Sequence, residues 1–150
     1  MPPEVGRWQA AENAAISVMN TYSYDEIRTP MLEATELFVR GVGEGTDIVI
    51  KEMYDFKDKK GRDIVLRPEG TASVVRAYIE NSLPEKSDLY YVGQMFRYER
   101  PQKGRDREFY QVGVESFGDH SALKDAEVIK LASDFITGVG ITDHSVEINS

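Results

Sequence analysis

The sequence predicts an α+β fold in which helices flank a mainly antiparallel sheet of about five or six strands. Three observations carry this prediction. Runs with apolar residues spaced three and four apart indicate helices, and shorter runs of period two indicate strands. Glycine or proline separates many of these runs. With 150 residues, 41% hydrophobic and 29% charged, the chain has the size and composition of one globular domain.

The first helix is expected directly after Pro2-Pro3, because proline is favoured at helix starts. Its apolar positions keep helical spacing from Val5 to Tyr22. A short strand over residues 24–28 follows and ends near Pro30, since proline cannot donate to a strand ladder. From the residues alone, Pro30 therefore marks only the end of a strand.

The middle of the chain is expected to hold a helical turn at 36–40 and a hairpin of strands 53–56 and 62–66. Between them, three glycines lie within residues 41–45. No Lys-Ser/Thr follows these glycines, so we interpret the stretch as a mobile loop and not as a phosphate-binding loop. After the hairpin, a helix begins near residue 71.

The last third predicts two strands, 89–96 and 108–117, from alternating apolar residues rich in aromatic and β-branched types. Helical spacing returns over 123–137, and glycines close that helix. Residues 144–148 are predicted to form a short final strand.

The loop between the two long strands, residues 97–107, is cationic. It has five basic and two acidic side chains, a local charge of +3, whereas the whole chain carries −8. A cationic loop on an acidic protein predicts an anion site, and guanidinium forks suit phosphate best. The alternative is a solvated hairpin tip. The basic residues are Arg97, Arg100, Lys103, Arg105 and Arg107.

An assumed antiparallel register pairs Arg97 with Phe109 and places Gly93 opposite Gly113. Facing glycines would leave space over the sheet for a bound molecule. The same face would carry polar side chains that converge on that space, namely Arg97, Gln111 and Glu115.

At this point the residues carry a family resemblance. The run FRYERPQKGR at 96–105, continued by REFYQ at 107–111, closely resembles motif 2 of the histidyl-tRNA synthetases, which are class II aminoacyl-tRNA synthetases. Residues 24–30 with 36–47 resemble that family's motif 1 region, and LRPEGT at 66–71 resembles its amino-acid-binding loop. The three motifs occur in the family's order and cover nearly the whole chain.

The resemblance implies a class II catalytic core that activates histidine with ATP and transfers it to tRNA(His). Arg97 would be catalytic and would grip the α-phosphate of ATP and the histidine carboxylate. Glu99 would contact the adenine edge, Arg105 the outer phosphates, and Phe109 would stack on the adenine. Mg²⁺ would bind through the ATP phosphates, and no metal ligand from the protein is identified.

By the same resemblance, Pro30 would lie in a homodimer interface. The amino group and imidazole of histidine would be held by Glu69, Thr71, Gln111 and Glu115. Two of these residues also have a structural explanation, because an acid or a threonine just before a helix often caps it. On the residues alone we weigh cap and ligand equally for Glu69 and Thr71; with the resemblance, the ligand role leads.

Composition excludes several classes of protein. There is no cysteine, so neither a disulfide scaffold nor a thiolate metal site is expected. No run approaches the ~20 apolar residues needed to cross a bilayer, and no signal peptide is evident. We therefore expect a cytoplasmic protein without a membrane partner. The charge of −8 argues against broad, non-specific nucleic-acid binding.

Residues 1–150 are expected to be a partial catalytic domain. Motif 3, with its ATP-clamping arginine, and the anticodon-binding domain are expected to be absent, because Arg107 is the last arginine. Such a piece would be weak or inactive alone. Two alternatives remain: the family's histidine-sensing paralogue, the regulatory subunit of ATP phosphoribosyltransferase, and a generic anion-binding module. The intact basic loop favours the synthetase, since a sensor does not need to grip ATP phosphates.

Overall fold

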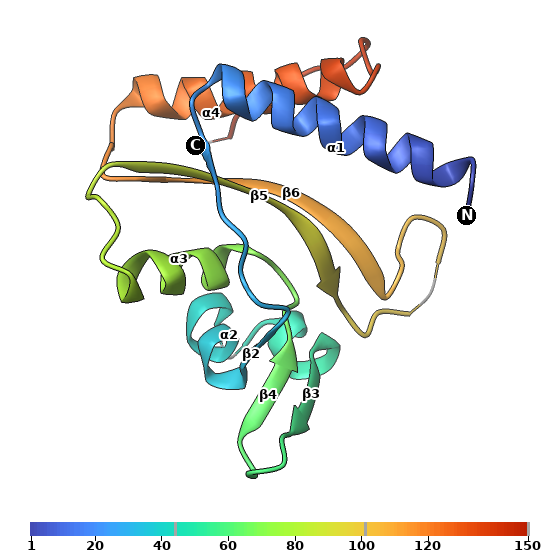
Figure 1. Cartoon of the computed structure of the whole chain (residues 1–150), viewed down its shortest axis with the longest axis vertical. Helices are drawn as coiled ribbons and strands as arrows, with labels where there is room; N and C mark the ends of the chain where they lie inside the picture. Colours follow the sequence, from blue (N-terminus) through green and yellow to red (C-terminus); the bar gives the residue numbers. More distant parts are fainter. Residues whose placement is uncertain (44, 101, 150) are drawn as a thin grey trace.

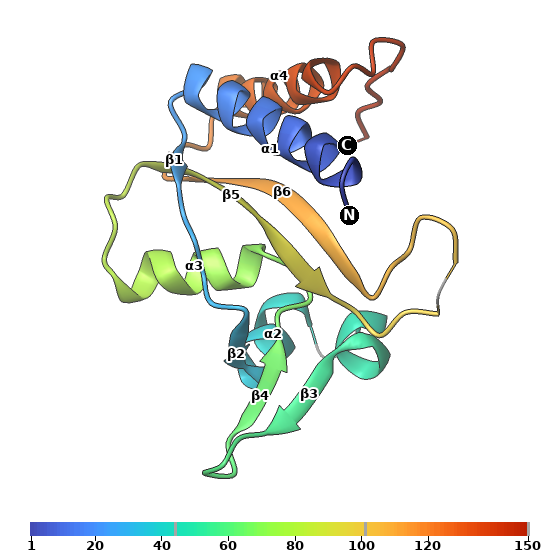
Figure 2. The same ribbon diagram turned by 45° about the vertical axis from the view of Figure 1, so that its right-hand side comes forward.

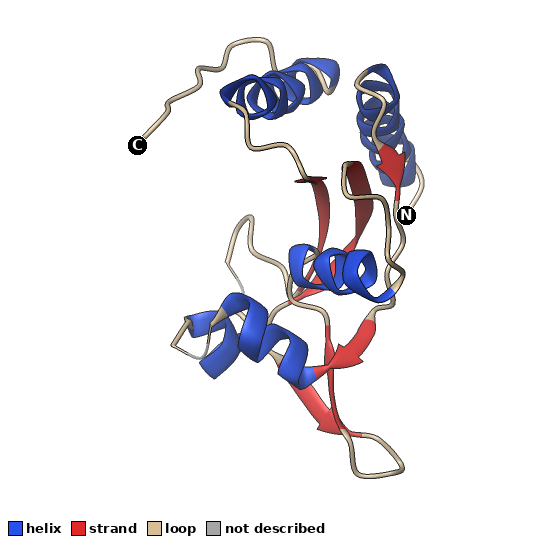
Figure 3. Ribbon diagram, turned by 90° about the vertical axis from the view of Figure 1, so that its left-hand side faces the viewer, coloured by secondary structure: helices blue, strands red, loops and turns tan. Residues whose placement is uncertain are grey.

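The computed structural model describes residues 1–43, 45–100 and 102–149. Two long strands, β5 (Ser87–Phe96) and β6 (Glu108–Phe117), curve across its middle. Helices α1 (Glu4–Thr21) and α4 (Ala122–Gly138) lie side by side on one face of these strands (Figure 1). Helix α3 (Thr71–Glu80) lies on the opposite face, and Figure 3 shows the layers from the side. The expected α+β class is confirmed.

The larger sheet has the order β1-β5-β6. Strand β1 (Asp25–Glu26) is shorter than expected and pairs in parallel with Leu89 and Tyr90 of β5. Strands β5 and β6 form an antiparallel ladder that runs from Ser87↔Phe117 to Phe96↔Glu108. The expected strands 89–96 and 108–117 are therefore confirmed, and the loop between them begins at Arg97.

The expectation of one continuous sheet is wrong. The remaining strands form a second sheet, antiparallel with the order β2-β4-β3, from β2 (Leu32–Ala34), β3 (Tyr54–Lys57) and β4 (Asp63–Leu66). The physical reason lies in the link between β1 and β2, which leaves the edge of β5 and descends to the smaller sheet (Figure 2). Helix α2 (Thr35–Val42) and a short π-helix, η1 (Ile48–Glu52), complete this lower part.

Alternation along β5 and β6 divides the core in two. On the α1/α4 face, Tyr90 packs with Met19, Tyr24 and Leu131. On the α3 face, Leu89, Tyr91 and Met95 pack with Val74. A third cluster, around Phe38 and Val65, joins α2 to the smaller sheet. The candidate site residues on β6 belong to the α3 face.

The ends of the chain differ in how well they were predicted. Helix α4 agrees with the expected 123–137, and the hydroxyl of Ser121 caps it by accepting a bond from Lys124 N at 3.3 Å. The expected strand at 144–148 is wrong: these residues are exposed and have no strand neighbour, so their alternation has no ladder to join.

Within the described residues, no helix is both long and apolar enough to cross a membrane.

Candidate functional site

The assumed register between β5 and β6 is wrong by two residues. Phe109 lies opposite Met95 instead of Arg97, and Gly113 lies opposite Tyr91 instead of Gly93. Because side chains alternate with a period of two, this shift keeps every residue on its expected face. Pairing Tyr91 with Gly113 gives the buried ring a place over a glycine, a recognised way to cover a glycine in a sheet.

The space expected over the glycines is occupied by the protein itself. A Cβ on Gly113 would lie 2.3 Å from Cζ of Tyr91, and a Cβ on Gly70 would lie 2.2 Å from Cε2 of the same ring. A Cβ on Gly93 would lie 2.5 Å from Nη2 of Arg67. The glycines therefore admit two buried side chains of this chain, Tyr91 and Arg67, which the sequence analysis did not select.

Arg97 stands just beyond the end of β5. Its backbone N–H donates to the carbonyl of Arg107 at 3.0 Å, which continues the ladder by one bond. Its Nε donates to the carbonyl of Pro68 at 2.9 Å, and its Cζ lies 5.1 Å from the centroid of the Phe109 ring. Among the described residues, its Nη groups have no hydrogen-bond partner, so they are available to an oxyanion.

Residues 67–70 connect β4 to α3, and together with Thr71, the first residue of α3, we call them the brace segment. The Glu69 carboxylate accepts from the N–H groups of Thr71 and Ala72 at 2.6 and 2.9 Å, so it caps α3. The N–H of Gly70 donates to Oε1 of Gln111 on β6 at 3.1 Å. The capping explanation for Glu69 is thus realised, while each carboxylate oxygen retains a lone pair for a ligand.

Glu115 lies near the start of α3, four residues along β6 from Gln111 and on the same face of the sheet. Burial raises the pKa of Glu115; interaction with the Thr71 hydroxyl opposes this shift, and the negative charge of Glu69 adds to it. Burial also raises the pKa of Tyr91 to about 12, so its hydroxyl stays protonated at neutral pH. The structure therefore gathers Glu69, Thr71, Gln111 and Glu115 around the Tyr91 ring.

The basic loop, residues 97–107, holds a second group of site residues. Glu99 is largely buried, and its Oε2 lies 3.4 Å from Nη1 of Arg105. That oxygen has no hydrogen-bond partner among the described residues. Arg107 lies over the Tyr98 ring, with its Cζ 4.0 Å from the centroid, so its guanidinium already has a contact within the loop. Arg105 is exposed.

The π-helix η1 adds residues that sequence reasoning missed. The N–H of Tyr98 donates to the carbonyl of Glu52 at 2.7 Å, which ties the basic loop to η1. Asp47 and Lys51 of this region line a cavity of about 540 Å³ together with Glu99 and Arg105. No local pattern identifies such residues, because their role depends on a contact between distant segments.

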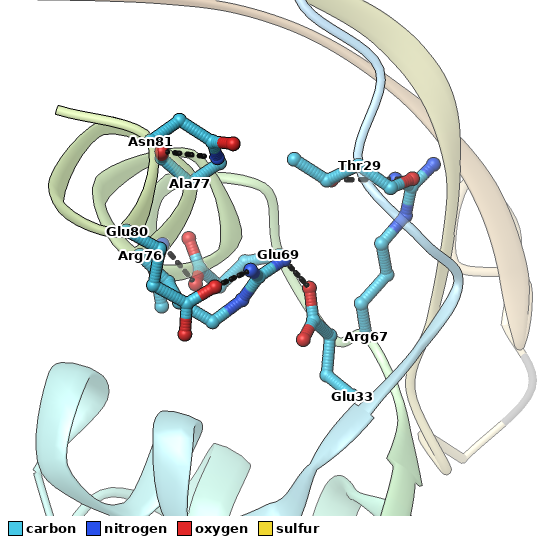
Figure 4. A network of polar contacts seen from close by, with 9 residues as sticks. Thr29, Glu33, Arg67, Glu69, Arg76, Ala77, Glu80 and Asn81 are labelled. Atoms are coloured by element: carbon cyan, nitrogen blue, oxygen red, sulfur yellow. Dashed lines mark hydrogen bonds and ion pairs between the residues drawn. The ribbon is translucent and has the colours of Figure 1, made fainter. Parts of the chain in front are cut away.

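Pro30 belongs to neither group and lies on the link between β1 and β2. It is exposed and borders a cavity of about 410 Å³ that Arg67, Tyr91 and Gly93 also line. Figure 4 shows Arg67 reaching toward Thr29, the residue before Pro30. The same figure shows Arg76 of α3, which pairs with the buried Glu33 of β2 at 2.7 Å and holds the smaller sheet against α3.

The chain is similar to known proteins over its full length. The family model for histidyl-tRNA synthetase matches residues 1–150. A histidine–tRNA ligase of Halothermothrix orenii is 54% identical over 153 residues, covering 100% of this chain and 36% of the relative. The chain thus spans about a third of the length of the curated relatives it matches.

Solved structures agree with this match. An apo histidyl-tRNA synthetase from S. aureus has a TM-score of 0.76 and 38% identity, covering 95% of this chain and 37% of that one. A structure described as an ATP phosphoribosyltransferase regulatory subunit/histidyl-tRNA synthetase from Bacillus halodurans has a TM-score of 0.81 and 27% identity, covering 95% and 36%. The family model matches the whole chain, and a curated relative shares more than half of its residues. The chain therefore belongs to the histidyl-tRNA synthetase family.

Proposed function

We propose that this chain forms the ATP- and histidine-binding part of a histidine–tRNA ligase catalytic domain. The reaction is formation of histidyl-adenylate and pyrophosphate, followed by transfer of the histidyl group to tRNA(His) in the cytoplasm. One observation carries the proposal: Arg97, Phe109, Gln111 and Glu115 share one face of a strand pair, and the brace segment meets that face through Pro68 and Gly70.

The ATP end of the site centres on Arg97 and the basic loop. The free Nη groups of Arg97 suit the α-phosphate, because a guanidinium offers two parallel donors to an oxyanion. Oε2 of Glu99 has an ion pair with Arg105 but no hydrogen-bond donor among the described residues, so it suits the exocyclic amino group of adenine, since a buried acceptor without a hydrogen bond favours a ligand that supplies one. Arg105 would reach the outer phosphates, and the Phe109 ring would stack on adenine.

The histidine end centres on the acids beside α3. Glu69 and Thr71 would take the ammonium group, with Gln111 held in place by Gly70. Glu115 would accept an N–H of the imidazole, and its half-buried position makes such a donor valuable. Tyr91 would form the floor under the ligand.

The proposed chemistry requires position and charge more than covalent participation by the protein. An oxygen of the histidine carboxylate attacks the α-phosphorus of ATP, and the bond from that phosphorus to the pyrophosphate oxygen breaks. Arg97 would hold the attacking carboxylate and stabilise the charge that develops on the α-phosphate. Mg²⁺ bound through the phosphates would neutralise part of their charge.

The homodimer also belongs to this proposal. Pro30 ends the 24–30 stretch that resembles the family's motif 1 region, α1 directly precedes that stretch, and Pro30 is exposed. Trp8 and Val5 of α1 are also exposed, at 51% and 45%. A second subunit would cover part of this apolar surface.

A second candidate function is histidine sensing without catalysis. It is favoured by the 0.81 TM-score with a structure whose description includes a regulatory subunit of ATP phosphoribosyltransferase. A sensor of this kind would bind histidine but would not need the phosphate contacts of Arg97 and Arg105. The basic loop therefore supports the ligase more strongly.

Pyrophosphate exchange dependent on each amino acid tests the proposal. We expect ATP binding and an exchange signal for histidine that exceeds the signal for leucine or phenylalanine. Arg97→Ala should weaken ATP binding by about 2–3 kcal/mol, because it removes a charged partner of a phosphate. Arg62→Ala is the control, since Arg62 pairs with Asp58 in the β3–β4 turn and lies outside the site.

The outcomes separate the two candidates. Histidine binding without ATP binding or exchange would favour the sensor. Equal signals for histidine and leucine would contradict the role of Glu115, and unchanged ATP affinity in Arg97→Ala would remove that residue from the site.

A further inference from the structure

Arg67 is a buried charged residue to which the proposed function assigns no ligand. Only 8% of its surface is exposed, although its side chain ends at the junction of three segments. We infer that Arg67 is a positioning residue, which fixes the brace segment and thereby orients Arg97 and Gln111. The inference rests on the proposed function, because those two residues are the ones expected to meet ATP and histidine.

Five hydrogen bonds hold Arg67 in place. Its Nε donates to the carbonyl of Gln94 at 2.9 Å, and its Nη1 donates to the carbonyl and hydroxyl of Thr29 at 2.8 and 3.0 Å. Its backbone N–H donates to Met31, and its carbonyl accepts from Phe96. Arg67 thus joins the end of β4 to the β1–β2 link and to β5.

The position of Arg67 follows from the divergence of β1 and β5. Among the described residues, the last backbone hydrogen bond along this edge runs from the N–H of Ile27, directly after β1, to the carbonyl of Tyr90, at 2.8 Å. Beyond it, the edge of β5 turns toward Arg67, which supplies a side-chain donor to Gln94 and a backbone acceptor to Phe96. Arg67 therefore supplies hydrogen-bond partners to the edge of β5 where the chain from β1 no longer pairs with it. The planar fork of a guanidinium can bridge two separated carbonyls.

The site of Arg67 is costly for a cation and tightly shaped. Burial lowers the pKa of Arg67, and the charge of Glu33 opposes this shift. On the sheet side, Gly93 leaves room for Nη2, because any Cβ there would lie 2.5 Å from that atom. A buried charge that is kept with such specific partners fixes geometry more than it adds stability.

The next residues transmit this geometry to the site. Pro68, directly after Arg67, accepts the Nε–H of Arg97 at 2.9 Å. Gly70, two residues further, donates to Gln111 at 3.1 Å. If the Arg67 side chain is lost, the start of the brace segment is released, and both contacts should loosen.

The experiment compares Arg67→Ala, Arg67→Lys and Arg28→Ala in this chain. Arg28 is the matched control: it lines the same 410 Å³ cavity, but its side chain is 82% exposed and, in the part of the chain that the structure describes, pairs only with Glu26. We expect Arg67→Ala to weaken ATP and histidine binding about 10- to 100-fold, as small displacements of site residues do. Arg67→Lys should recover only part, because an ammonium cannot reproduce the planar fork.

Two further measurements separate positioning from general stability. Methylguanidinium can enter the cavity left by Arg67→Ala, so it should restore part of the binding in that variant and leave Arg28→Ala unchanged. Hydrogen exchange of the Gly70 amide should accelerate in Arg67→Ala, while amides of the β5–β6 ladder keep their rates. Equal acceleration throughout, with affinity restored after correction for the folded fraction, would reduce Arg67 to a structural role.

Failure of the proposed function would look different. If the unmodified chain binds neither ATP nor histidine, the proposed function is wrong, and exchange at Gly70 still decides whether Arg67 fixes the brace segment. If the unmodified chain binds both ligands and Arg67→Ala binds them equally well, the inference is overturned while the function stands.

Discussion

The brace segment and the basic loop form the two ends of the candidate site, and they are built differently. In the brace segment, polar groups are already bonded: Glu69 caps α3, Gly70 donates to Gln111, and Arg67 makes five hydrogen bonds. In the basic loop, Arg100 and Lys103 have no polar partner among the described residues, and Arg105 is exposed.

This difference teaches how the two ends would recognise their ligands. The brace segment is fixed by packing and hydrogen bonds before a ligand arrives, which suits selection of one amino acid. The basic loop offers long cationic side chains in solvent, which suit a flexible triphosphate. The following variants test the contrast, from the largest expected effect to the smallest.

The largest effect is expected for Gly113→Ala. The new methyl group would collide with the Tyr91 ring, which is held between Gly113 and Gly70. Overpacking of this kind costs about 1–3 kcal/mol of unfolding free energy. Gly104→Ala in the basic loop should cost less, about 1 kcal/mol, because only its left-handed φ of +82° is strained. Urea denaturation measures both, and an equal or greater loss in Gly104→Ala would break the contrast.

A smaller effect is expected for Glu69→Ala. The substitution leaves the N–H groups of Thr71 and Ala72 without their acceptor, so unfolding should become easier by about 0.5–2 kcal/mol. The corresponding acid of the basic loop is Glu99, whose partner Arg105 is 63% exposed. A pair with such exposure contributes about 0–1 kcal/mol. Thermal unfolding should therefore show that Glu69→Ala is less stable than Glu99→Ala.

Within the basic loop, Arg107→Ala should have a modest effect. It removes a cation from the face of the Tyr98 ring and a bond to the Glu99 carbonyl, and the stacking contributes about 0.5–1 kcal/mol. Lys103→Ala, which removes an exposed charge, should stay within about 0.5 kcal/mol of the parent chain. Chemical denaturation of the two variants side by side would show whether Arg107 is structural, and indistinguishable midpoints would count against the stacking.

The smallest effect concerns Glu115 and appears only as a pH dependence. Its folded pKa is raised above the ordinary 4.5, so the folded state holds the proton more strongly than the unfolded state. Stability should therefore fall as pH rises from that value through the folded pKa, and then level off. Glu115→Gln lacks this loss, so its advantage over the parent chain should grow across the same window. Glu108→Gln, at an exposed position at the start of β6, is the matched control for loss of a carboxylate on the same strand.

Much of the fold was predictable because its signals are local. Helical and strand periodicities placed α1, α3, α4, β3, β4, β5 and β6 close to their observed bounds. The faces of β5 and β6 were also correct, because a two-residue error in register does not change the side to which a side chain points. The sequence motifs likewise indicated the family that the comparisons established.

The misses share a physical cause, which is contact between distant segments. Strand β2 and helix η1 are short and lack a strong period, and their place depends on β4 and on Tyr98. The final strand was expected from an alternation that finds no partner. The division into two sheets depends on the direction of the β1–β2 link, which no local pattern encodes.

The sequence by itself determined which residues are candidates for the proposed site: the arginines of the basic loop, the acids near α3, and the glycines on the sheet face. Only the tertiary structure decided what fills the space over those glycines. Tyr91 lies over Gly70 and Gly113, and Arg67 lies over Gly93. A glycine in the sequence shows that there is space above the backbone at that position. The packing of residues far apart along the chain determines whether a ligand or another side chain of the protein fills that space.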